Sequence, residues 1–121
     1  MFDQIGTTVV LDESHLDAVT GLSGSGPAYV FSFIEALIDA GVAEGLNRDV
    51  SANLALQTVS GAVELLRKNG EHPALERARV SSPGGTTIAA SRILEREGFQ
   101  AIIMDAVAAA TARSKELGEN K

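Results

Sequence analysis

Cysteine and tryptophan are absent from this 121-residue sequence, which also has only one tyrosine and four phenylalanines. Without cysteine there can be no disulfide and no thiolate metal site, and nothing points to an oxidising compartment. With so few aromatic rings, a core has to be built from Ala, Val, Ile and Leu, whose small side chains favour close approach between helices. The length suits one compact domain and leaves little room for two.

Basic residues are also scarce, since 10 Lys and Arg stand against 16 Asp and Glu, for a net charge of −6. An acidic chain repels nucleic-acid phosphates and anionic lipid surfaces, so we expect no nucleic-acid or membrane partner. The most apolar stretch we identify, Phe99 to Ala112, contains Asp105 and is too short to span a bilayer. The N-terminus has no basic segment followed by an apolar run, so we expect no signal peptide and a cytoplasmic location.

The first twelve residues differ in pattern from the rest. Residues 7–11 are β-branched or apolar without helical period, which predicts a strand or an extended linker. A lone strand has no partner in so helical a chain. We therefore expect residues 1–12 to be an extended remnant of a neighbouring domain and 13–121 to be a helical domain.

From residue 13 onward, capping residues and helix breakers predict an all-α bundle. Asp12, Ser25 and Asn47 are the expected N-caps, Pro27 lies in a first turn, and 21–26 is expected to break the chain. Asn69-Gly70 and Gly98 are expected to end helices. The predicted helices are 13–20, 27–44, 48–69, 73–79, 86–97 and 99–117.

Two of these helices are apolar on nearly every side. Between Ala28 and Ala43 the polar positions are only Ser32, Glu35 and Asp39, and the last helix is interrupted mainly by Asp105 and Thr111. A small monomer has too much surface to bury two such helices, which favours a partner chain interleaved about a two-fold axis. The alternative is that both helices lie centrally in a small bundle. The helix 48–69 has instead one polar stripe, typical of a surface helix: Asn53, Gln57, Ser60, Glu64 and Arg67.

The strongest local signal for binding is residues 82–87, SPGGTT, which lead directly into a helix. Two glycines allow backbone N–H groups to approach a ligand, and the helix N-terminus adds donors and the positive end of the dipole. No Lys or Arg lies in the loop, so a carboxylate fits better than a polyphosphate. The alternative is a plain helix-entry turn, with Thr86 as cap and the glycines serving geometry only.

Other features carry weaker signals. The glycines of 21–26 do not make a dinucleotide-binding fingerprint, because the preceding residues look helical and Pro27 lacks a donor; a hinge is expected instead. The only histidines, His15 and His72, are expected to be surface or capping residues, and no metal site is expected. Glu71 and Glu76 are expected to be surface charges.

Two long segments resemble the pyrroline-5-carboxylate reductase family. Residues 17–29, DAVTGLSGSGPAY, resemble the opening of the family's C-terminal domain, and 80–89, VSSPGGTTIA, resemble the family signature. Segments 57–62, 98–99 and 106–117 also match at the expected spacings. The resemblance covers nearly the whole chain, from about Phe2 to Leu117.

The resemblance implies a dimerisation and substrate-binding domain of an enzyme that reduces 1-pyrroline-5-carboxylate to L-proline, the last step of proline biosynthesis. Family members bind NADPH or NADH mainly through an N-terminal Rossmann domain, which has no counterpart in these 121 residues. Helices of two subunits interleave, and some members assemble dimers into larger oligomers. The resemblance therefore implies a homodimer that holds no cofactor by itself and is inactive alone, as an excised domain or a natural fragment.

Site residues are implied by the same resemblance. The substrate carboxylate is expected at the backbone N–H groups of Gly84, Gly85 and Thr86 with the hydroxyl of Ser82. The Thr87 hydroxyl is expected at the ring nitrogen. Catalysis would then rest chiefly on positioning the imine carbon against the hydride donor.

Three residues outside the loop can also be compared with the family pattern. Thr20 and Val80 are expected near the nicotinamide, whereas Ser91 stands where a leucine is expected. If Ser91 is buried, its hydroxyl needs a partner. The competing interpretations are a non-catalytic oligomerising module or scaffold derived from the family, and an unrelated acidic adaptor, which would require both motif matches to be accidental.

Overall fold

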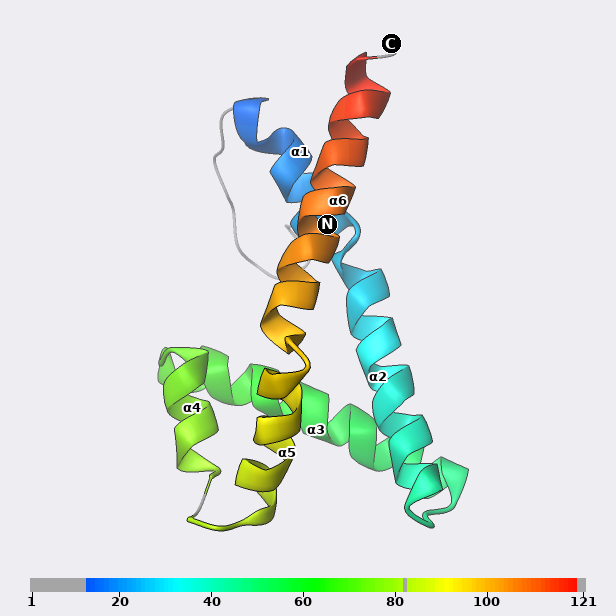
Figure 1. The fold of residues 1–121 in the computed structure, drawn as a ribbon, viewed down its shortest axis with the longest axis vertical. Helices are drawn as coiled ribbons and strands as arrows, with labels where there is room; N and C mark the ends of the chain where they lie inside the picture. Colours follow the sequence, from blue (N-terminus) through cyan, green and yellow to red (C-terminus); the bar gives the residue numbers. More distant parts are fainter. Residues whose placement is uncertain (1–12, 82, 120–121) are drawn as a thin grey trace. The chain divides into compact units, whose positions relative to one another are not determined.

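The computed structural model describes residues 13–81 and 83–119 and is helical over most of them (Figure 1). No strand occurs in these two ranges, so the expected all-α class is confirmed. The predicted strand or linker at 7–11 and the cap Asp12 lie outside the described residues. A 3-10 turn, Glu13–His15, and a π-helical turn, Thr20–Gly24, accompany the α-helices, which are α1 (Leu16–Val19), α2 (Gly26–Ala43), α3 (Arg48–Asn69), α4 (Pro73–Arg79), α5 (Thr86–Arg96) and α6 (Phe99–Glu119).

Local capping signals set most of these boundaries. The Asn47 side chain accepts a hydrogen bond from the Asp49 amide at 2.8 Å, and α3 ends at Gly70, whose φ is 63°. His72 caps α4, with Nδ1 accepting from the Ala74 amide at 3.0 Å. Asn47 therefore has the capping role expected from the sequence, and His72, expected to be a surface or capping residue, is a cap, because each supplies an acceptor to a first-turn N–H group.

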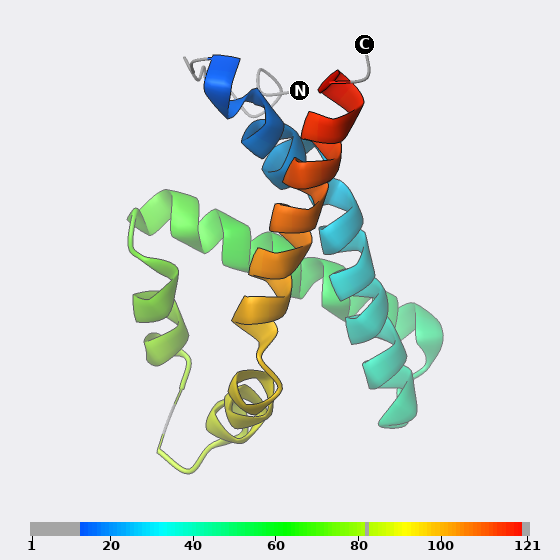
Figure 2. The same ribbon diagram turned by 45° about the horizontal axis from the view of Figure 1, so that its top comes forward.

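The chain divides into two compact units, the first comprising Met1–Pro27 with Ala101–Lys121 and the second Ala28–Gln100. In the first unit, α1 and the π-helical turn lie beside the C-terminal part of α6 in both ribbon views (Figure 2). Ser114 donates from Oγ to Oδ1 of Asp17 at 2.7 Å. The expected single domain over 13–121 stays a prediction.

The expected break at 21–26 is wrong over most of its length. Helical structure continues through the π-helical turn to Gly24, and α2 begins at Gly26 after one bend at Ser25. Gly21 is buried, and a Cβ placed there would meet Thr111 Oγ1, the Val107 carbonyl oxygen at 2.9 Å and the Thr111 amide at 3.0 Å. This glycine therefore permits contact with α6 and does not make a hinge.

The second unit contains α2 from Ala28 onward, α3, α4 and α5. Where α2 meets α3, Ser51 is only 3% exposed and donates from Oγ to the Ile38 carbonyl at 2.8 Å. A Cβ on Gly41 would meet this hydroxyl and would lie 3.1 Å from the Ser51 Cβ, so the small residue lets the helices approach closely. The rings of Phe33 and Phe99 pack with centroids 6.1 Å apart.

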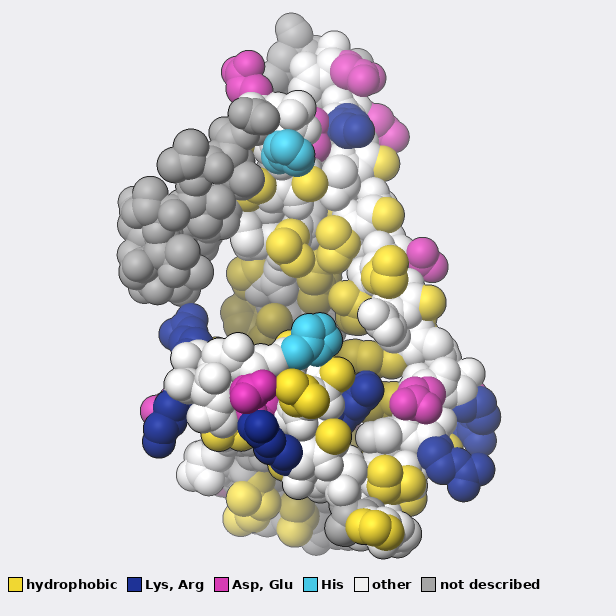
Figure 3. Space-filling view, turned by 90° about the vertical axis from the view of Figure 1, so that its left-hand side faces the viewer, with side chains coloured by type: hydrophobic (Ala, Val, Ile, Leu, Met, Phe, Trp, Pro, Cys, Tyr) yellow, Lys and Arg dark blue, Asp and Glu magenta, His cyan; other side chains and the backbone are white. Residues whose placement is uncertain are grey.

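Apolar side chains are mostly exposed in the described ranges. Ala55 is the one buried hydrophobic residue there, while α1 to α6 all carry exposed large hydrophobic side chains, many of them visible in Figure 3. Neither α2 nor α6 has a buried residue, so a central position for these helices in a single-chain bundle is wrong. The expected polar stripe of α3 is exposed, but the opposite face is exposed as well, as at Leu54 and Leu56.

Among the described residues, one helical stretch, Glu13–Ala43, meets a length-and-composition criterion for crossing a membrane, with a mean hydropathy of 1.2 over an 18-residue window. It differs from Phe99–Ala112, the most apolar stretch expected from the sequence. One such helix is weak evidence for a membrane, because core helices of soluble proteins satisfy the same criterion.

Candidate functional site: the loop at the start of α5

The loop between α4 and α5 turns the chain at Gly84 and leads it into α5 at Thr86. Gly84 has a φ of 66°, in the left-handed region, whereas Gly85 is extended and is the N-cap of α5 without a side-chain cap. Thr86 is thus the first helical residue, and the alternative that it caps the helix is wrong. The amides of Thr86 and Thr87 lie in the first turn, where N–H groups have no intrahelical acceptor.

The described part of this loop is open to solvent. Gly84 and Thr86 are exposed, and Gly85 and Thr87 are half-buried. The predicted residues Gly84 to Thr87 therefore lie together at the positive end of the α5 dipole, a geometry that suits an anionic group. Ser82, the remaining predicted residue of the loop, lies outside the described residues.

Alanine at Gly84 is expected to destabilise the chain by about 1 kcal/mol, because an L side chain is strained at positive φ. Gly85→Ala is the matched control, since the φ of −83° and ψ of 178° at Gly85 are accessible to any residue. Urea unfolding of both variants measures the difference. Equal losses would show that the left-handed turn does not matter for stability.

The two residues predicted near a nicotinamide lie in different units. Val80 ends α4, is 63% exposed and lines an apolar hollow of about 490 Å³ between α3 and α4. Thr20 lies in the first unit at the start of the π-helical turn, where its Oγ1 donates to the Leu16 carbonyl at 3.1 Å. Val80 is thus exposed and is close in sequence to the loop at 82–87.

Glu76 is not the surface charge that we expected. Its side chain is only 11% exposed and accepts hydrogen bonds at Oε1 from Asn69 Nδ2 at 3.1 Å and from the Arg79 guanidinium at 2.5 Å. Arg79 also reaches Glu71 at 3.5 Å. The spacing of Glu76 and Arg79 by three residues on one helix was the available signal for this pair.

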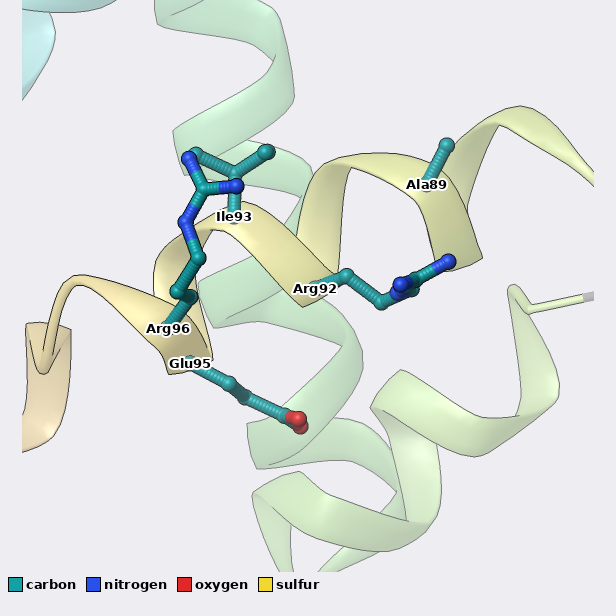
Figure 4. Close-up of a pocket in the computed structure, with 5 residues that line it drawn as sticks. All are labelled: Ala89, Arg92, Ile93, Glu95 and Arg96. Atoms are coloured by element: carbon teal, nitrogen blue, oxygen red, sulfur yellow. The ribbon is translucent and has the colours of Figure 1, made fainter.

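Two other hollows involve α5. One is lined by α5 alone, where Figure 4 shows Arg92 and Arg96 extending from the helix and Glu95 pointing away from Ile93 and Arg96. The other lies between α4 and α5 and is lined in part by Ser91, which is half-buried. Ser91 is thus not enclosed in a core, and the described residues leave no buried side-chain polar atom without a hydrogen bond. Among residues 13–81 and 83–119, no three or more His, Cys, Asp or Glu side chains are grouped so that they could hold a metal ion.

Comparison with known proteins identifies the family. The family model for pyrroline-5-carboxylate reductase dimerisation matches residues 13–117. The chain belongs to this family. It is 53% identical to the pyrroline-5-carboxylate reductase of Synechocystis sp. over 119 residues, covering 98% of this chain and 45% of the relative. The Arabidopsis thaliana reductase is 52% identical over 120 residues, covering 99% of the chain and 44% of the relative.

A solved structure agrees with these sequence relationships. The pyrroline carboxylate reductase of Plasmodium falciparum, determined with NADP bound, has a TM-score of 0.87 and 44% identity, covering 89% of this chain and 44% of that protein. The chain therefore corresponds to the dimerisation domain and spans less than half the length of these reductases. The family assignment supports the resemblance stated from the two sequence motifs, and it excludes the unrelated acidic adaptor.

Proposed function

We propose that two copies of the chain form a homodimer through their apolar helix faces. Phe31 on α2 is 69% exposed and Met104 on α6 is 64% exposed, and neither helix has a buried residue. Each Å² of apolar surface removed from water contributes about 25 cal/mol, so a covering partner is strongly favoured. A second copy is the natural partner in a family described by its dimerisation.

The loop at the start of α5 is the proposed substrate site. The observation that carries this proposal is the left-handed turn at Gly84, which leads directly into the first turn of α5. Backbone N–H groups of Gly84, Gly85 and Thr86, with the Ser82 hydroxyl, would bind the carboxylate of 1-pyrroline-5-carboxylate. The Thr87 hydroxyl would hydrogen bond to the ring nitrogen.

The residues of this chain suit contact with only one part of the cofactor, the nicotinamide ring. The loop has no Lys or Arg to neutralise phosphates, but Val80 offers an exposed apolar side chain that suits contact with a flat ring. Val80 would therefore lie at the nicotinamide end, and the rest of NADP or NAD would be held by a Rossmann domain of the reductase. When bound, the reduced cofactor supplies the hydride.

The contribution of this chain to the reaction would be orientation. Fixed N–H donors hold the carboxylate in one place, and Thr87 fixes the direction of the ring nitrogen, so the imine carbon is presented in one orientation. A protonated imine is already electrophilic, which leaves little acid–base work for side chains. The absence of His and Cys from the loop agrees with this division of roles.

The proposed function is thus dimerisation and substrate binding in a cytoplasmic reductase that converts 1-pyrroline-5-carboxylate to L-proline with NADPH or NADH. The isolated chain is expected to be inactive. A chimera tests the proposal: the aligned segment of the Synechocystis reductase is replaced by this chain, and substrate-dependent NADPH oxidation is followed. We expect turnover by the chimera, none by the chain alone, and a raised KM in Thr87→Val. A folded but inactive chimera would favour a purely oligomerising module.

A further inference from the structure

Glu76 is the one buried charged side chain among the described residues, and its environment is mainly apolar. It lines the hollow between α3 and α4 together with residues such as Leu65, Leu66 and Pro73. A carboxylate in such a place is costly unless it is paired and hydrogen bonded. Both conditions are met here by Asn69 and Arg79.

The two hydrogen-bond partners of Glu76 lie at the ends of helices. Asn69 is the last residue of α3, and Arg79 is the last residue of α4. Glu76 and Arg79 both belong to α4, so the hydrogen bond from Asn69 is the one that joins the end of α3 to α4. Because this bond forms only when α4 lies against the end of α3, it specifies how α4 is placed.

Helix α4 depends on such anchoring because it has only seven residues, too few to be stable in isolation. Its last turn continues directly into the loop: the Ser81 Oγ donates to the Arg77 carbonyl at 2.8 Å, and the Ser81 amide donates to Ala78 at 3.2 Å. Any displacement of the end of α4 is thereby transmitted to Ser81, three residues before the turn at Gly84.

We propose that Glu76 is a positioning residue that, held between Asn69 and Arg79, fixes the end of α4 and so sets the position of Ser81, from which the chain continues to the turn at Gly84. This inference rests on the proposed function for its meaning in the reaction, because the loop is the proposed carboxylate site. Its structural content does not depend on that function. Glu76 would touch neither substrate nor cofactor.

Hydrogen exchange on the full 121-residue chain tests the structural content. In Glu76→Ala, the amides of Val80 and Ser81, which donate to the carbonyls of Glu76 and Ala78 at the end of α4, are expected to exchange about tenfold faster, while those around Ser51 and Ala55 change little. Glu76→Gln keeps an acceptor for both partners and should stay within about threefold of the original chain. The matched control is Glu71→Ala, which removes only the 3.5 Å contact to Arg79 and should leave the loop unchanged.

Asn69→Ala decides the question if Glu76→Ala fails to fold. It removes the donor on α3 but leaves the Glu76–Arg79 pair, and faster exchange confined to the Val80 and Ser81 amides is expected. Unchanged loop exchange in both variants, or equal acceleration across the second unit, would overturn the proposal. So would a control that behaves like Glu76→Ala.

The chimeric reductase tests the link to the reaction. There Glu76→Ala is expected to raise KM for the substrate about tenfold with kcat changed much less, because the loop is misplaced and the chemistry is untouched. An unchanged KM in an active chimera would overturn the role of Glu76 in positioning. An inactive chimera would count against the proposed function alone, and the exchange experiment would still decide the role of Glu76.

Discussion

Alanine at Gly21 is expected to destabilise the chain by about 3 kcal/mol, the upper end of what overpacking costs. The added Cβ would meet the Val107 carbonyl oxygen at 2.9 Å and the Thr111 amide at 3.0 Å, as well as Thr111 Oγ1. Two of these three atoms are backbone of α6, which cannot move aside as a flexible side chain can. Urea unfolding measures the loss.

Gly26→Ala is the matched control for that prediction, because a Cβ there has no neighbour within 4 Å. It should change stability by no more than about 0.5 kcal/mol. Combining Gly21→Ala with Thr111→Ala removes the side-chain contact but not the backbone contacts, so only part of the loss should be recovered. Equal stability of Gly21→Ala and Gly26→Ala would contradict the close approach of the π-helical turn to α6.

Aspartate at Phe31 is expected to weaken the homodimer at least about 100-fold. Phe31 is 69% exposed in the single chain, and in the proposed dimer the partner covers it. A charge buried there without a partner would cost several kcal/mol, more than most interface residues contribute. Sedimentation equilibrium over a dilution series measures the change in dimer dissociation constant.

Ser32→Asp adds the same charge at the neighbouring residue and is the matched control. Ser32 is one of the three polar positions of α2 with Glu35 and Asp39, and all three are exposed, so it should remain in water in the dimer. Its dissociation constant is expected to match that of the original chain. A Phe31→Asp chain that dimerises equally well would place the interface on other helix faces.

Local chemistry in the sequence was sufficient to predict most of the helix boundaries, but not the helical structure over Thr20–Gly24. Asn47 and His72 each supply an acceptor to an N–H group two residues ahead, and Gly70 stops α3 in the left-handed region. These effects act within one turn of the chain, so they can be recognised without knowing the fold. The glycine turn before α5 is predictable for the same reason.

Contacts between different helices could not be predicted from local sequence in this way. Gly21 looked like a hinge because glycine breaks helices, but its role comes from α6, some ninety residues away. Glu76 looked like a surface charge because its burial depends on where α4 meets the end of α3. Exposed apolar faces such as that of α2 indicate a partner, but the register of two chains is set by shape at contacts that a single sequence does not display.

Solution mass tests the central claim, that this family domain exists as a homodimer through its apolar helices. Light scattering of the 121-residue chain across a dilution series is the most direct measurement. A homodimer gives twice the 12.6 kDa chain mass, or a larger even multiple, persisting on dilution. A well-folded species at the mass of one chain would rule out the homodimer, because the exposed faces of α2 and α6 would then have no partner.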